Sequence, residues 1–289
     1  MEIKKRSKWG ERLGYVYIYS TAFIIFAILL IILLDISVKG ISVINWEFLT
    51  TSPREGMTKG GILPCIIGTF AVSVITVIFS VPLGIFSAIY LNEYARDTKL
   101  TRLIRLAIRN LSGVPSIVYG LFGVALFVDL FQFGTSILSA GLTLGLLTLP
   151  WTITSSEEAL KTVPKSYREG ALALGATKWQ AIRTNVLPYA TPGILTGTIL
   201  GLSRAAGETA PILFTGAAFF LPNIPSSLFD QFMALPYHLY IMSTQHHDIE
   251  GVRPIAYGTA LVLIAIVLLM NLAAIRIRYK YRKKIKGRG

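Results

Sequence analysis

Two oppositely charged residues stand four positions apart in the middle of a long apolar stretch. Arg204 and Glu208 belong to the segment LSRAAGETAPI at residues 202–212. On a helix, residues four apart share one face. An ionisable residue at the bilayer centre costs roughly 2.5–3.5 kcal/mol on insertion scales, so it usually faces the protein interior and marks function. Arginine offers a planar, permanently charged fork of donors, which suits an oxyanion such as phosphate.

Pro211 predicts a break in the helix beside this pair. Because proline has no N–H, it cannot donate a hydrogen bond to the carbonyl of Gly207, and the helix is kinked or opened there. Transporters place substrate sites where broken helices expose backbone near the bilayer midplane. The predicted substrate-path residues are Ser203, Arg204, Gly207, Glu208, Thr209 and Pro211.

A purely structural ion pair between Arg204 and Glu208 is the alternative. Two observations weigh against it: arginine before glutamate is the weaker i,i+4 order, and an apolar contact would link helices at lower cost. Both roles can also coexist, with Glu208 orienting Arg204 at rest and an anion competing for it. The sequence leaves this choice open.

The composition defines the class of protein that must position these residues. Of the 289 residues, 53% are hydrophobic and 15% are charged, against about 25% charged in soluble domains. Apolar runs of about twenty residues recur, which is the length that crosses a bilayer core of about 30 Å. The predicted fold class is an all-α, polytopic membrane protein with six transmembrane helices. The expected spans are residues 15–34, 65–91, 112–133, 136–154, 191–220 and 255–275.

Lysine and arginine fix the expected orientation. The N-terminal segment, residues 92–111 and residues 155–188 carry five each, the tail carries eight, and the alternate loops carry four in all. By the positive-inside rule, both termini and these two basic loops face the cytoplasm. Membrane insertion thereby accounts for the net charge of +13, and no nucleic-acid partner is expected.

These boundaries divide the chain into three parts. We expect a basic cytoplasmic N-terminus at 1–14, a six-helix transmembrane domain at 15–275 and a basic cytoplasmic tail at 276–289. The loop at 221–254 is expected to be extracytoplasmic, and its segment 226–243, rich in Phe, Met, Leu and Tyr, is expected on the membrane surface or against a partner. Ser112 is expected to cap the third span, with Pro115 in its first turn.

Residues 155–188 form a polar segment between the fourth and fifth spans. Residues 166–169 have the S-x-x-E form of a capping box, and residues 177–180 have the T-x-x-Q form. Gly175 lies just before the second box, where a helix end favours a residue that tolerates positive φ. Two short helices joined at a glycine are therefore predicted, although an ordinary solvated loop is the simpler alternative.

A small apolar face is expected between the two boxes. Ala171, Leu172 and Leu174 would form it, with Arg168 and Glu169 on its flanks. Such a face suits a groove on a cytoplasmic partner.

Missing motifs limit the chemistry of the chain. It has no G-x-x-x-x-G-K-[ST] segment for ATP phosphates, no G-x-S-x-G and no H-E-x-x-H. Its single cysteine, Cys65, excludes an internal disulfide and is expected as a small apolar helix residue. His246 and His247 lack further ligands, so a solvated loop is predicted there rather than a metal site. We expect no catalytic residue, metal or cofactor, and the chain is not predicted to be an enzyme.

The polar segment resembles a known signature. Membrane subunits of bacterial ABC importers carry E-A-A-x3-G-x9-I-x-L-P in a cytoplasmic loop that docks on the ATPase. Here it reads Glu169-Gly170-Ala171, then Gly175, then residues 185–188, with Gly170 and Asn185 as departures. We call residues 155–188 the docking loop. The resemblance implies these docking residues: Ser166, Arg168, Glu169, Gly170, Ala171, Leu172, Gly175, Leu187 and Pro188.

A second resemblance concerns the substrate. Residues 203–211 resemble the PstA-type permease subunits of phosphate importers, as do residues 60–64, 113–120 and 157–160. This implies an ABC-importer permease (MetI-like) fold in the cytoplasmic (inner) membrane and transport of inorganic phosphate. It also implies a complex with a PstC-type second permease subunit, two PstB-type ATPase subunits and an extracytoplasmic PstS-type phosphate-binding protein.

Two other functions stay open at this point. A permease for another oxyanion, such as sulfate, molybdate or phosphonate, would use the same arginine chemistry. A secondary transporter or channel would work alone, but it predicts an internal repeat, and the sequence shows no convincing one.

Overall fold

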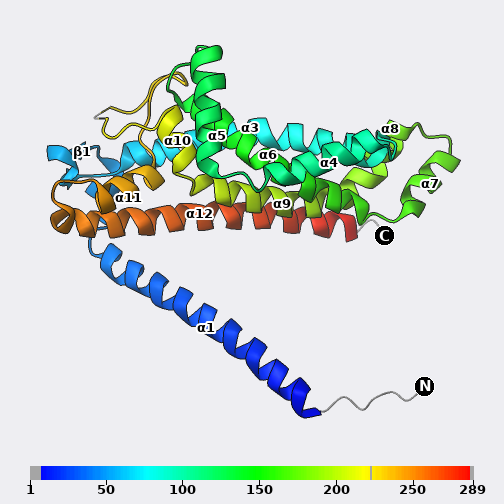
Figure 1. The fold of residues 1–289 in the computed structure, drawn as a ribbon, viewed down its shortest axis with the longest axis horizontal. Coiled ribbons are helices and arrows are strands. Elements are labelled where there is room, and N and C mark those ends of the chain that lie inside the picture. The colour runs from blue at the N-terminus through cyan, green and yellow to red at the C-terminus, as the bar shows by residue number, and fades with distance from the viewer. Residues whose placement is uncertain (1–7, 222, 287–289) are drawn as a thin grey trace.

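Among the described residues, five helices are long and apolar enough to cross a bilayer, and a bent pair of helices makes a sixth crossing if the pair counts as one span. The structure is a computed structural model, and it describes residues 8–221 and 223–286. The long helices are α1 (Lys8–Ile41), α3 (Leu63–Ile89), α6 (Ile137–Lys161), α9 (Leu187–Ala206) and α12 (Ile249–Lys286). Four of them run side by side as one elongated bundle (Figure 1), which confirms the predicted all-α membrane fold.

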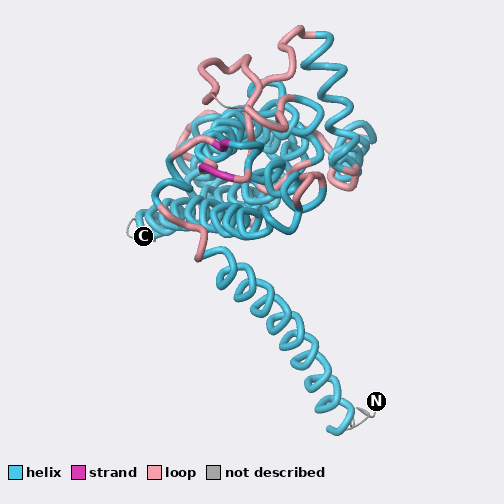
Figure 2. The backbone as a smooth tube through the Cα atoms, turned by 90° about the vertical axis from the view of Figure 1, so that its left-hand side faces the viewer, coloured by secondary structure: helices cyan, strands magenta, loops and turns pink. Residues whose placement is uncertain are grey.

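The helix α1 leaves this bundle at an angle (Figures 1 and 2). It meets α12 only near its last turns, where Gly40 lies so close that a Cβ there would be 2.7 Å from the carbonyl oxygen of Tyr257. None of its most apolar stretch is buried within the chain. A long apolar surface of α1 is therefore left for lipid or another protein.

Glycines bring α6 and α9 into close contact. Gly193, Gly197 and Gly201 follow one another at intervals of four on α9, so they share a face. A Cβ on Gly197 would lie 2.1 Å from Ser155 Oγ, and one on Gly193 would lie 2.7 Å from Ala159 Cβ. Small residues let helix backbones approach in this way. The two helices that flank the docking loop are thus packed tightly together.

The third crossing differs from its prediction. Residues 99–111, expected as a loop, form the helix α4 (Lys99–Leu111), and Ser112 ends that helix instead of starting the next one. Thr98 caps the start of α4 by accepting a hydrogen bond from the Thr101 N–H. The helix α5 (Ser116–Gly123) begins only after Pro115, because proline disfavours helical backbone in the residue before it. A π-helical stretch (Val124–Leu130) continues α5. The helix α4 and this combined helix at 116–130 meet at an angle of 102°.

The loop at 221–254 is also different, because much of it lies inside the fold. Its helix α11 (Leu235–Thr244) is buried against α3 and α12, and Leu235 donates its N–H to Thr69 Oγ1 at 2.9 Å. The placement expected on the membrane surface or against a partner is therefore wrong for α11. The apolar side chains of α11 and of the residues just before it instead fill the core. Those almost fully buried are Phe232, Met233, Leu235, Ile241 and Met242.

Two of the three histidines in this loop, His238 and His246, are buried as well. His238 is 2% exposed and lies 3.2 Å from Thr259 Oγ1; burial lowers its pKa to about 4, and the nearby His246 contributes to the lowering. His246, predicted to be solvated, is 5% exposed, and its Nε2 lies 2.9 Å from the Gly56 carbonyl oxygen. His247 is exposed, as predicted.

Gly56 belongs to a small hairpin at the same end of the bundle (Figure 2). The hairpin joins β1 (Pro53–Arg54) to β2 (Lys59–Gly60) and follows the short helix α2 (Trp46–Thr50). This end therefore carries the hairpin and α11, whereas the docking loop occupies the opposite end (Figure 1).

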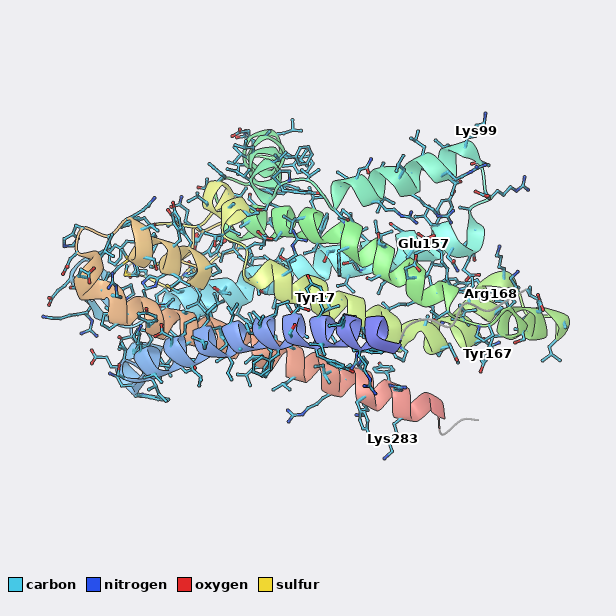
Figure 3. All side chains as sticks on the ribbon, turned by 60° about the horizontal axis from the view of Figure 1, so that its bottom comes forward. Tyr17, Lys99, Glu157, Tyr167, Arg168 and Lys283 are labelled. Carbon is cyan, nitrogen blue, oxygen red and sulfur yellow. The ribbon has the colours of Figure 1, made fainter. Side chains whose placement is uncertain are left out.

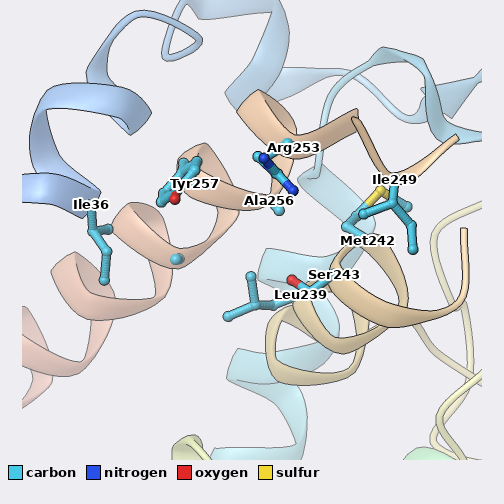
Figure 4. A pocket seen from close by; sticks show the side chains of 9 residues that line it. Ile36, Leu239, Met242, Ser243, Ile249, Arg253, Ala256 and Tyr257 are labelled. Carbon is cyan, nitrogen blue, oxygen red and sulfur yellow. The ribbon is translucent and has the colours of Figure 1, made fainter. Parts of the chain in front are cut away.

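A cavity of about 350 Å³ lies between the end of α1, α11 and α12 (Figure 4). Its walls are mainly apolar, with Ile36, Leu239 and Met242 among them. The cation that borders it, Arg253, forms a 2.7 Å ion pair with Glu250. Arg204 is not among the residues that line this cavity.

Candidate transport site and docking loop

The helix carrying Arg204 is broken where the sequence predicts. The helix α9 ends at Ala206, Gly207 forms its C-cap, and a short helix α10 (Ala210–Thr215) starts three residues later with Pro211 in its first turn. The Gly207 N–H returns to the Arg204 carbonyl at 3.1 Å. The charged segment therefore lies at a helix end, next to backbone that no longer follows the helical ladder.

Arg204 and Glu208 face each other across this break, but loosely. The Arg204 Nε lies 3.4 Å from Glu208 Oε1, the longest ion pair among the described residues. The Arg204 side chain is 56% exposed, while that of Glu208 is 17% exposed. Because a guanidinium has five N–H donors, most of those on Arg204 are free to bind another group.

The remaining predicted path residues have different surroundings. Behind Glu208 is a cavity of about 10 Å³, lined also by Thr69 and Ser73; this is space for about one water. Ser203 Oγ bonds the Ile199 carbonyl and the Asn271 side chain, so it fastens α9 to α12. Thr209 precedes α10 without capping it.

A second broken helix meets the first one here. Gly120 of α5 is packed so closely that a Cβ there would lie 3.1 Å from Pro211 Cα and 3.2 Å from the Ala210 carbonyl. The adjacent Tyr119 donates its Oη–H to the Leu111 carbonyl at the end of α4, at 3.0 Å. The sequence does not directly predict this contact, although Pro115 is a signal of a break in the helix and Gly120 is a signal of a close approach between helices.

The docking loop consists of two short helices joined at a glycine, as predicted. They are α7 (Lys165–Ala173) and α8 (Lys178–Ala181), and α6 continues to Lys161 before them. Thr177 and Gln180 form the predicted capping box, and Gly175 has φ +83. The first predicted box is wrong: α7 starts directly after Pro164, so Ser166 lies inside its first turn and makes no cap bond.

The outer surface of the docking loop is partly apolar. Leu174 is 91% exposed, and Leu172 and Trp179 are each nearly half exposed. Glu169 and Gly170 are exposed beside them, and nothing lies within 4 Å of a Cβ placed on Gly170. Ala171, expected on this surface, is instead buried against the bundle.

Arg168 points the other way, into the bundle (Figure 3). Its Nη2 lies 2.6 Å and its Nε 3.0 Å from Glu93 Oε1, and Nε also reaches Oε2 at 3.1 Å. Two further donors bind the carbonyls of Val163 and Leu160 at 2.9 and 3.0 Å. Arg168 therefore holds α7 to the end of α3, and the flank of the outer surface is left to Glu169.

A second ion network lies next to it. Arg105 of α4 donates from Nε to Glu157 Oε1 at 2.8 Å and from Nη2 to the Leu91 carbonyl at 2.7 Å. Lys161 reaches the same Glu157 oxygen at 3.2 Å. Lys161 and Glu157 are neighbours on one helix face, but Arg105 lies 52 positions from Glu157, so no local pattern indicates that contact.

A family model describing the inner membrane component of binding-protein-dependent transport systems matches residues 80–287. The chain belongs to this family. It is thus a multi-pass membrane subunit of an ABC importer, the class that works with an ATPase and a substrate-binding protein.

Individual proteins show more closely which importers the chain is similar to. The chain is 35% identical to the probable ABC transporter permease protein YqgI of Bacillus subtilis, over 88% of this chain and 90% of that one. It is 35% identical to the phosphate transport system permease protein PstA of Mycobacterium leprae, over 93% and 89%. A solved inward-facing structure of the MetNI methionine ABC transporter is 18% identical and covers 76% of this chain and 94% of that one with a TM-score of 0.57, which confirms the MetI-like fold.

Proposed function

We propose that the chain is the permease subunit of an importer for inorganic phosphate, and that Arg204 binds the anion during its passage. The observation that supports this most directly is the loose 3.4 Å pair at the helix break, with more than half of the Arg204 side chain exposed. An oxyanion can take over the free donors of such a guanidinium. Glu208 then orients Arg204 while no anion is bound. The similarity to PstA-type proteins supports phosphate as that anion.

The docking loop supplies the second half of the proposal. Leu172, Leu174 and Trp179 form an exposed apolar surface beside Glu169, and an ATPase subunit would cover it. The chain itself has no P-loop segment, so we assign ATP hydrolysis to two PstB-type partners and no enzymatic role to this subunit. A PstC-type permease subunit and an extracytoplasmic PstS-type binding protein complete the assembly.

Movement of the docking loop would reach the charged break through α6 and α9. The loop joins these helices, and the glycine face on α9 packs them tightly. Arg168 adds a rigid link from α7 to α3 through Glu93. A displacement of α7 would therefore shift α9 as a body, and the change of direction would fall at Gly207, where the helix is already interrupted.

This proposal also fixes an orientation. Lys99, Arg168 and Lys283 all lie toward the docking-loop end of the bundle (Figure 3). We assign that end, and with it both termini, to the cytoplasm by the positive-inside rule. The domain limits proposed are 1–14, 15–275 and 276–289, with the hairpin and α11 on the outer side.

Reconstitution tests the proposal. The chain is produced with the second permease subunit, the ATPase and the binding protein, and ATP-driven phosphate uptake is measured in proteoliposomes. We expect uptake that sulfate and molybdate do not inhibit. Uptake of sulfate or molybdate in place of phosphate would support a permease for another oxyanion, and ATP-independent uptake by the chain alone would support a secondary transporter.

A further inference from the structure

The helix α4 carries three distinct surfaces along its 13 residues. Its inner face, with Thr101 and Arg105, packs on the chain. One flank is apolar and exposed, and includes Leu100, Ile104, Ala107 and Leu111. The other flank is basic and exposed: it carries Arg102 and Arg109, and it is bordered by the exposed Leu106, beyond which Lys99 lies at the start of the helix. Residues 102 and 109 are two turns apart and therefore lie on one side of the helix.

Little negative charge accompanies the basic flank. Arg102 has one partner, Asp97, at 3.3 Å, and both of these side chains are more than 60% exposed, so the pair is weak. Within the described residues, no ion pair involves Lys99 or Arg109. The acid that α4 does meet, Glu157, is already bound by Arg105 and Lys161. The flank thus keeps its positive charge.

The location of α4 connects this flank to Arg204. From Lys99 at the docking-loop end, α4 runs beside α6 (Figure 3) for about 20 Å. It ends at Leu111, whose carbonyl accepts the hydrogen bond from Tyr119. The next residue, Gly120, packs against Ala210 and Pro211 just beyond the helix break that follows Arg204. A line of positive charges therefore leads from the broken helices to the end of the bundle.

We propose that the basic flank of α4 forms the inner part of the anion's path, and receives the oxyanion after it leaves Arg204. Charge of one sign along a cleft concentrates the opposite ion, and several weak sites in series let an ion leave as easily as it enters. The positive-inside rule accounts for basic residues in this segment, but it does not account for their collection on one flank. The inference rests on the proposed transport of an oxyanion.

Cysteine reactivity locates the flank without relying on transport. Cys65 is the one cysteine and is fully buried, so it should not react with a thiol reagent in the experiment. Arg102→Cys and Arg109→Cys are compared with Ile104→Cys and Ala107→Cys in the assembled complex, in inverted vesicles, using a negatively charged methanethiosulfonate. We expect reaction on the basic flank only, and slower reaction when inorganic phosphate is added. Equal reaction on both flanks, or none on the basic flank, would overturn the proposal.

A transport assay then tests whether the positive charge of Arg102 and Arg109 contributes to phosphate uptake. Arg102→Gln and Arg109→Gln together should lower phosphate uptake by about tenfold, with unchanged membrane amounts and ATPase co-purification, and Arg→Lys at both positions should restore most of it. Full uptake by the glutamine variant would refute a role in the path, and so would failure of the lysine variant to exceed it. A wild-type complex that imports no phosphate would instead refute the proposed function, since the cysteine test still reads the flank.

Discussion

Two of the arginine–glutamate pairs among the described residues, Arg168–Glu93 and Arg204–Glu208, have the same chemistry and opposite construction. Arg168 and Glu93 are mostly buried, bonded through both carboxylate oxygens, and supported by two backbone carbonyls. Arg204 and Glu208 meet through one contact of 3.4 Å, with the arginine more than half exposed. The guanidinium of Arg168 uses most of its five N–H donors, whereas that of Arg204 uses one. A buried, satisfied pair holds two elements together, whereas a loose one can exchange its partner.

The largest expected effect is on transport by Arg204. Arg204→Gln should lower phosphate uptake roughly a hundredfold, as the loss of an oxyanion-binding donor does elsewhere. Its melting temperature in the purified complex should stay near that of wild type, because exposed pairs contribute about 1 kcal/mol or less. Arg204→Lys, which keeps the charge and loses the fork, should fall between. Wild-type uptake by Arg204→Gln would place the anion elsewhere.

The second effect is on stability. Arg168→Gln leaves Glu93, which is 6% exposed, as a buried charge without its partner, and this should cost about 3–5 kcal/mol of folding free energy. Thermal unfolding of the complex and its ATPase content report the loss. The double variant Glu93→Gln/Arg168→Gln should recover part of it. A single variant as stable as wild type would show that the pair does not hold α7.

The free energy of unfolding should also depend on pH, through the side chain of His238. Its pKa in the folded protein is about 4, against about 6.5 in an unfolded chain, so the unfolded chain takes up a proton that the folded one refuses. Stability should be unaffected by this group above pH 6.5, and should fall by about 1.4 kcal/mol per unit as pH drops from 6.5 to 4. His238→Gln should flatten that part of the profile of melting temperature against pH. An unchanged slope would assign the acid sensitivity to another group.

Two alanine substitutions give the smallest effects and opposite signs. Gly197→Ala places a methyl group against Ser155 in the α6–α9 contact and should destabilise by about 1–3 kcal/mol. Gly170→Ala meets open space within α7 and should stabilise that helix by up to about 1 kcal/mol. Melting temperatures of the two variants provide the check. If Gly197→Ala is neutral, the helix pair is looser than its packing indicates.

Features with a local cause were predictable from the sequence. Pro211 starts a new helix after the break instead of continuing α9, Thr177 caps the turn that follows it, and Gly175 takes a backbone angle that its lack of a side chain permits. Long apolar runs likewise predicted the crossings, and Cys65 is buried in a helix as expected.

Contacts that depend on tertiary packing between distant parts of the chain were not predictable from the sequence. Arg168 lies 75 positions from Glu93, and nothing local indicates that it turns inward while Glu169 stays outside. Pro164 rather than Ser166 set the start of α7, because the helix could begin at the first residue after the proline. The apolar residues of the segment 226–243 were expected on the membrane surface or against a partner, but those of α11 are buried against α3 and α12 of the same chain.

The burial of α11 has a consequence for where ions can pass. Phe232, Leu235 and Ile241 are fully buried in the outer half of the bundle, and the space behind Glu208 amounts to about 10 Å³. A space of this size has no room for an oxyanion at that point in the interior. We therefore propose that the chain forms one wall of a pore, with Arg204 on its surface, and that the second permease subunit forms the opposite wall. On this proposal an unassembled copy leaves the membrane sealed, and the opening forms only when the two subunits join.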